Sequence, residues 1–117
     1  MKTLKRVEIT YKKVHYMTPH SEIEENVIYI SDEYGTSSHK CLCGCGELTV
    51  LPLGKGEWSY QIDANDKLFM QPSVGNYQLP CKSHYIITKG GANFVWLIKY
   101  KLWKYYTLHQ TLMDMKK

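Results

Sequence analysis

Short stretches of alternating hydrophobic and polar residues recur along most of the chain, a pattern typical of half-buried β-strands. The segment at 4–16, LKRVEITYKKVHY, alternates loosely and is rich in β-branched residues, so it predicts a first strand that ends before Pro19. The run VIYIS at 27–31 predicts a second strand, which leads to a turn at Gly35. These patterns predict a fold that is mainly β.

Further elements follow between turn-forming residues. Ser21 is placed to cap a short acidic stretch, EIEEN, that is brief enough to be a single helical turn. The remaining elements are a strand in ELTVLPL, a hairpin of WSYQI and KLFMQ around DAND, a structured loop in PSVGNYQLP, and a hairpin of HYIITK and NFVWLIKY around Gly90-Gly91. From Val95 onward helical and strand periodicities overlap, and we expect a strand that passes into a C-terminal helix.

Length and composition favour one small globular domain. The 117 residues fit a single core, and the 44% hydrophobic and 22% charged residues are ordinary for a folded, soluble protein. The N-terminus lacks the apolar run of a secretory signal, so we expect a cytoplasmic protein, in which clustered cysteines bind metal or do chemistry. The prediction is a compact single domain over 1–117 of α+β type, mainly β, with short antiparallel strands, a metal-binding cysteine loop and a C-terminal helix.

The charge gives little sign of a nucleic-acid or membrane partner. The formal net charge is +4, but fourteen of the fifteen basic residues are lysine, and only Arg6 offers the planar guanidinium that base and phosphate recognition favour. The lysine-rich and aromatic segment at 96–112 is amphipathic, and such segments usually pack their apolar face on the core. We therefore expect no nucleic acid partner, and we do not expect membrane binding.

The stretch HKCLCGCGE places three of the four cysteines at every second position. In an extended strand such side chains lie about 6.6 Å apart, too far for the ~3.8 Å sulfur spacing of a tetrahedral site with Zn–S bonds of about 2.3 Å. The backbone must therefore curl, and the two glycines of the stretch permit the positive φ that this needs. We predict a zinc ion held by Cys41, Cys43 and Cys45, with Cys81 or His84 closing the site; buried free thiols are the alternative.

Three motifs in a fixed order resemble a known family. DEYGTSSHKCLCGCGE is followed by QPSVGN and then by PCKSHYIIT, and together they resemble a small bacterial family, formerly of unknown function, whose genes are often found beside ubiquitin-like conjugation genes. The family pattern is approximately HxCxCGCGE, PSxGN and PCxSHYxI, and it covers about residues 3–96. The resemblance implies a peptidase that processes a ubiquitin-like protein or removes it from its targets. A ubiquitin-like protein or its conjugates is therefore the expected partner.

The resemblance carries over, residue by residue, to positions whose side chains can do chemistry. These are His39, Cys41, Cys43, Cys45, Ser73, Asn76, Cys81, Ser83 and His84. The extension at 97–117 exceeds the family pattern, and it leaves the choice of partner open.

Ser73 is the nucleophile that the resemblance favours. Proline and glycine turn residues around it can present its Oγ, and backbone N–H groups near the glycine can serve as an oxyanion hole. His84 or His39 is the base that would activate it. The alternative is an ordinary turn, in which the serine bonds its own backbone.

The role of the zinc depends on whether all four cysteines bind it or only three. Four cysteine ligands complete a closed structural site and free His84 for catalysis, with Asn76 and Ser83 as supporting residues. If one cysteine does not bind the zinc, the ion can hold a water molecule, and Glu47 as general base would make the protein a metallopeptidase. A further alternative is Cys81 as a thiol nucleophile. We predict a serine peptidase with structural zinc. The alternative from another class is a non-catalytic, zinc-stabilised binding module of a ubiquitin-like conjugation system.

Overall fold

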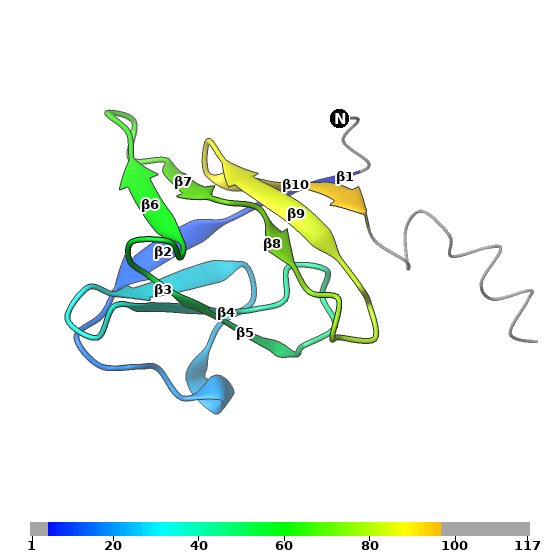
Figure 1. Ribbon diagram of the computed structural model, residues 1–117, viewed down its shortest axis with the longest axis horizontal. Helices are drawn as coiled ribbons and strands as arrows, with labels where there is room; N and C mark the ends of the chain where they lie inside the picture. Colours follow the sequence, from blue (N-terminus) through cyan, green and yellow to red (C-terminus); the bar gives the residue numbers. More distant parts are fainter. Residues whose placement is uncertain (1–4, 97–117) are drawn as a thin grey trace, which may run out of the picture.

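This computed structural model describes residues 5–96 of the chain. They contain ten short strands and one single-turn 3-10 helix, η1 (His20–Glu22), joined by loops and turns (Figure 1). One sheet has the order β1 (Lys5–Glu8), β10 (Gly91–Trp96), β9 (His84–Thr88), β8 (Val74–Gly75). A second has the order β2 (Thr10–Lys13), β3 (Val27–Ser31), β4 (Thr36–Lys40), β5 (Leu48–Pro52). A hairpin of β6 (Ser59–Ile62) and β7 (Leu68–Gln71) completes the set.

The prediction of a mainly β fold with antiparallel strands is confirmed. Every strand pair except β2–β3, which is parallel, runs antiparallel among the described residues. Both predicted hairpins are present, as β6–β7 and β9–β10. The predicted C-terminal helix lies outside the described residues. No helix within residues 5–96 has the length and apolar character needed to cross a membrane.

The strand predicted over 4–16 is in fact two strands that belong to different sheets. β1 pairs with β10, whereas β2 pairs with β3. The change occurs at Ile9, which is buried and whose backbone N–H donates to the carbonyl oxygen of Gly90. Alternation continues through this residue, so the hydrophobic pattern gives no sign that the pairing partner changes. The crossing ties the two sheets to one core.

The predicted helix cap at Ser21 is wrong. The helical turn already begins at His20, and Pro19 stands at its N-terminal boundary without a side-chain cap. Ser21 therefore lies inside the turn. The short length that the sequence predicted for this element is correct.

β4 has no apolar residue, and the sequence did not predict it. It lies between β3 and β5, and Ser37, Ser38 and His39 within it are buried. A strand with this composition is unusual in the middle of a sheet, because buried polar groups require hydrogen-bond partners. β4 leads directly into the cysteine loop, so this polar strand carries the chain to the candidate site.

Candidate active site and metal centre

The pairing of β8 with β9 separates the candidate residues onto two faces. Gly75 lies opposite His84 in this ladder. Because side chains alternate across a strand, Ser73, two residues before Gly75, is expected on the same face as His84. Both are partly exposed, whereas Ser83 and Tyr85, which flank His84, are fully buried. One face of the β8–β9 ribbon is thus open to solvent and the other faces the interior.

Ser73 and His84 are in direct contact on the open face. The Oγ of Ser73 lies 2.6 Å from Nε2 of His84, a normal hydrogen-bond distance between a hydroxyl and a ring nitrogen. Ser73 follows Pro72, whose peptide bond with Gln71 is cis, in the link between β7 and β8. With the proton on Oγ and a free electron pair on Nε2, this pair has the geometry of a serine nucleophile and its base.

Tyr77 contacts the other nitrogen of the same imidazole. Its hydroxyl lies 2.6 Å from Nδ1 of His84, and the two rings meet edge to face. The sequence analysis did not single out this residue. A signal was available, since Ser73, Gly75 and Tyr77 are spaced two apart, as side chains on one face of a strand are.

The four cysteines converge on the buried side of the ribbon. Their Sγ atoms all lie within 4.8 Å of one another. Cys41 Sγ is 3.5 Å from that of Cys43 and 3.7 Å from that of Cys81, and Cys45 Sγ is 4.0 Å from that of Cys81. These spacings match the ~3.8 Å that four sulfurs around one zinc ion require. The donor set therefore fits a tetrahedral metal ion.

The curl that brings alternate cysteines together depends on the two glycines, as predicted. Gly44 has φ of 92° and Gly46 has φ of 82°, values that L side chains rarely adopt. The N–H of Gly44 donates to the carbonyl oxygen of Cys41, and the N–H of Cys41 donates to that of Glu47. The loop thus closes on itself and turns its thiols inward.

Contacts within the cluster lower the pKa of one of its thiols. The pKa of the Cys41 thiol is lowered to about 4, first by its hydrogen-bonding contact with Cys43 and also by Ser83 and Asn76, although burial opposes the shift. The same contact raises the pKa of Cys43, and burial raises that of Cys45. A thiolate is the form that binds metal, so this cluster already favours a cation.

Asn76 and Ser83 support the cluster from the buried face. The side-chain amide of Asn76 donates to Cys41 Sγ and to the Tyr85 hydroxyl, at 3.3 Å each. The Ser83 hydroxyl lies 3.2 Å from Cys41 Sγ. Such contacts orient ligand atoms in metal sites. Ser83 is buried away from Ser73 and His84, which fits a supporting role.

The geometry favours His84 as a base over His84 as a metal ligand. Both of its ring nitrogens are hydrogen-bonded, to Ser73 and to Tyr77, whereas the potential ligand group within residues 5–96 consists of the four cysteines. Cys81 belongs to that group and is buried, which disfavours it as an exposed nucleophile. Glu47 is exposed at the end of the loop and is not part of the ligand group.

His39 lies apart from the Ser73–His84 pair. It is fully buried, and its Nε2 is 2.7 Å from the hydroxyl of Tyr85. Burial lowers the pKa of His39 to about 3, so the ring is neutral near pH 7. The hydroxyl of Tyr85 also accepts from Asn76, which links His39 to the support of the cysteine cluster. This environment favours a structural role for His39 over that of the base.

Substitution of His39 should affect folding rather than catalysis. In His39→Leu, Tyr85 loses a buried hydrogen-bond partner, and we expect the free energy of unfolding to fall by about 2 kcal/mol. His39→Gln, whose amide can reach the same hydroxyl, should lose less. Chemical denaturation measures both. A folded His39→Gln protein with a hundredfold lower kcat would instead identify His39 as a catalytic group.

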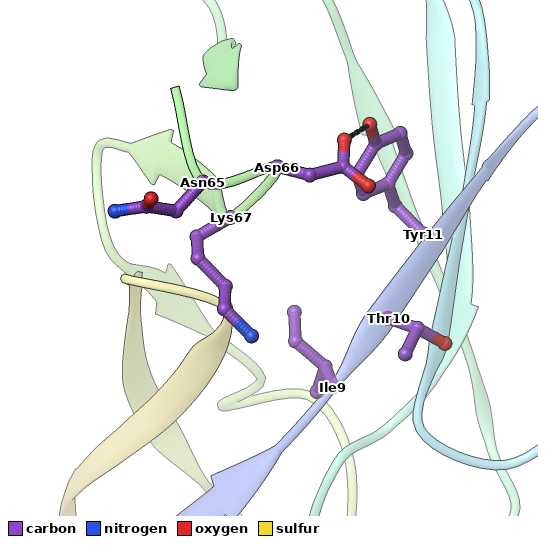
Figure 2. Close-up of a pocket in the computed structure, with 7 residues that line it drawn as sticks. Ile9, Thr10, Tyr11, Asn65, Asp66 and Lys67 are labelled. Atoms are coloured by element: carbon purple, nitrogen blue, oxygen red, sulfur yellow. Dashed lines mark hydrogen bonds between the residues drawn. The ribbon is translucent and has the colours of Figure 1, made fainter. Parts of the chain in front are cut away.

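Two pockets among the described residues lie away from the Ser73–His84 pair. One pocket, of about 210 Å³, lies where the β1–β2 crossing meets the β6–β7 turn, and its lining includes Ile9, Tyr11, Asp66 and Lys67 (Figure 2). The Tyr11 hydroxyl is hydrogen-bonded to the Asp66 carboxylate there. A second pocket, of about 300 Å³, is lined in part by Trp58. Neither of these two pockets includes Ser73 or His84, which are both partly exposed.

Comparison with known proteins identifies a family. The model of the family described as "Bacterial ubiquitination-like system serine protease (BubE)" matches residues 14–95, which is more than half of the chain and includes all four cysteines, Ser73 and His84. Neither a curated protein nor a solved structure matches.

Proposed function

This chain belongs to the bacterial ubiquitination-like system serine protease family (BubE), and on that premise we propose that it is a peptidase that cleaves a ubiquitin-like protein from a C-terminal extension or from a conjugate. The observation that carries the proposal is the 2.6 Å contact between Ser73 Oγ and His84 Nε2 on an open face of the β8–β9 ribbon. Family membership supports a serine protease mechanism. The contact supports Ser73 as the nucleophile and His84 as the base.

In the first half of the reaction Ser73 becomes acylated. His84 Nε2 takes the Oγ proton as Oγ bonds to the carbonyl carbon of the scissile amide, and the carbonyl electron pair moves to oxygen. The tetrahedral intermediate then collapses and the C–N bond breaks. The leaving amine takes the proton from Nε2, and the acyl group remains on Ser73 as an ester.

In the second half water takes the place of the amine. Nε2 removes a proton from water as the water oxygen attacks the ester carbon, and the same proton returns to Ser73 Oγ when the ester bond breaks. The products are a free carboxylate on the ubiquitin-like protein and an unmodified enzyme. The leaving amine can be the α-amine of an extension or the ε-amine of a lysine, because both present the same amide bond.

The exposure of the site supports a polypeptide substrate. Ser73 and His84 are partly exposed on the face of the β8–β9 ribbon that is open to solvent. An extended chain end, such as the tail of a ubiquitin-like protein, can reach a serine that is exposed in this way.

We propose that zinc has a structural role here. Cys41, Cys43, Cys45 and Cys81 would hold it, and four thiolates leave no open position for a water molecule. The ion would supply folding free energy and rigidity. Cys81 lies three residues before His84, so fixing Cys81 also fixes the start of β9 and thereby the base.

The function can be tested with a ubiquitin-like precursor that carries a short extension after its mature C-terminus. The wild type should release the extension, and mass spectrometry should place the cut at that C-terminus. A phosphonate that labels activated serines should modify Ser73 and should fail to label His84→Ala. Binding without cleavage, and without labelling, would favour the non-catalytic module; cleavage that depends on Glu47 and resists the phosphonate would favour a metallopeptidase.

A further inference from the structure

Tyr77 lies beside Nδ1 of His84, where serine hydrolases usually have the group that orients the catalytic histidine. For Nε2 of His84 to accept the proton of Ser73, the neutral imidazole must carry its own proton on Nδ1. An acceptor beside Nδ1 favours that tautomer and fixes the ring. The Tyr77 hydroxyl lies 2.6 Å from Nδ1, and its oxygen has the electron pairs for this contact.

The need for an acceptor increases during the reaction. Once Nε2 has taken the serine proton, both ring nitrogens of His84 carry hydrogen, and the imidazolium donates on both sides. The Tyr77 oxygen accepts the Nδ1 hydrogen in this state too. Because Tyr77 as a whole residue is 58% exposed, its own hydroxyl hydrogen can turn toward water. The same contact thus serves the resting base and its charged form.

Gly75 provides independent support, because the chain leaves space for the tyrosine ring at this position. A Cβ on residue 75 would lie 2.7 Å from Cε2 of Tyr77, closer than real carbon contacts allow. The ring therefore lies directly over the Gly75 backbone, opposite His84 in the ladder. The Lys82 ammonium donates to the carbonyl oxygen of Tyr77 and holds the backbone of this loop.

We propose that Tyr77 is the positioning residue of the active site: it accepts the Nδ1 hydrogen of His84 and completes a Ser73–His84–Tyr77 relay in which a neutral phenol stands where other serine hydrolases place a carboxylate. The inference rests on the proposed function, since it gives His84 the role of base. It also gives Gly75 a role, which is to leave room for the ring.

Tyr77→Phe tests the hydroxyl alone, because the ring remains. We expect kcat for precursor cleavage to fall about tenfold to a hundredfold, less than the ~10⁴-fold loss when a carboxylate orienter is changed, with KM and melting temperature unchanged. Gly75→Ala, which displaces the ring, should reproduce this effect. Tyr34→Phe is the matched control: Tyr34 is 54% exposed, and its hydroxyl has no hydrogen-bond partner among residues 5–96.

Nitrogen NMR of labelled histidine provides a readout that needs no substrate. The wild type should show the proton of His84 on Nδ1, with the His84 signals assigned by their loss in His84→Gln. Tyr77→Phe should shift the tautomer balance toward Nε2, and Tyr34→Phe should not.

The outcomes separate this inference from the proposed function. If Ser73→Ala is inactive while Tyr77→Phe retains the wild-type kcat and tautomer, the relay is refuted and the serine mechanism stands. If Ser73→Ala cleaves normally, the proposed function fails. An unchanged His84 spectrum in Tyr77→Phe overturns the relay even where no substrate is cleaved.

Discussion

Ser73→Ala should reduce the kcat for cleavage of a ubiquitin-like precursor by about 10⁴- to 10⁶-fold, as loss of the nucleophile does in serine hydrolases. Only one hydroxyl group is removed, and its partner is the partly exposed His84 rather than a core residue. We therefore expect the melting temperature and the metal content to stay at the wild-type values. Single-turnover assays, followed by mass spectrometry of the released extension, measure the loss.

Ser83→Ala is the matched control for this experiment. Ser83 is also a serine near His84 in sequence, but it lies on the buried face of the ribbon and contacts Cys41 Sγ. Its loss should lower the free energy of unfolding by about 1 kcal/mol and leave kcat nearly unchanged. If Ser73→Ala kept full activity and Ser83→Ala abolished it, the assignment of the nucleophile would be wrong.

The strand content was predictable where burial alternates with exposure. β5 and the hairpins follow the period-2 pattern, and β3 is a continuous β-prone run, so hydrophobicity alone indicates them. β4 was not predicted because it has no apolar residue and is placed by its pairing with β3 and β5. Its buried histidine, His39, is held by Tyr85, a residue 46 positions away. No local pattern can indicate a hydrogen bond of that kind.

The candidate site was predictable to the extent that motifs indicate chemistry. The cysteine spacing, together with two glycines, predicted a curled loop, and the described thiols do converge. The motif resemblance pointed to Ser73 and to two histidines, but only the register of β8 on β9 distinguishes them, because it places His84 beside Ser73. For Tyr77 the sequence offered only its spacing of two residues from Gly75, because the contact with His84 depends on how the loop at 76–83 folds back.

Removal of the metal should unfold the domain. We expect the purified protein to carry one zinc ion per chain, because the four sulfur atoms all lie within 4.8 Å of one another, close enough to share one tetrahedral ion. Binding of structural zinc contributes about 10 kcal/mol or more, which is comparable with the total stability of a small domain, about 5–15 kcal/mol. Cys43→Ser should therefore yield a metal-deficient and largely unfolded protein, and a strong chelator should have the same effect on the wild type.

The reason for so large an effect lies in what the cysteines connect. Cys41, Cys43 and Cys45 follow β4 of one sheet, whereas Cys81 precedes β9 of the other, so a bound ion joins the two sheets beside the active site. Without it, the four sulfur atoms lie close together with no ion to join them, and the loop ahead of His84 loses its anchor. Circular dichroism and metal analysis of the wild type, Cys43→Ser and Ser83→Ala, with and without chelator, measure this. If the purified wild type carried no metal and chelator left its melting temperature unchanged, the cluster would be only a set of buried thiols. The two sheets would then be joined by the apolar core alone.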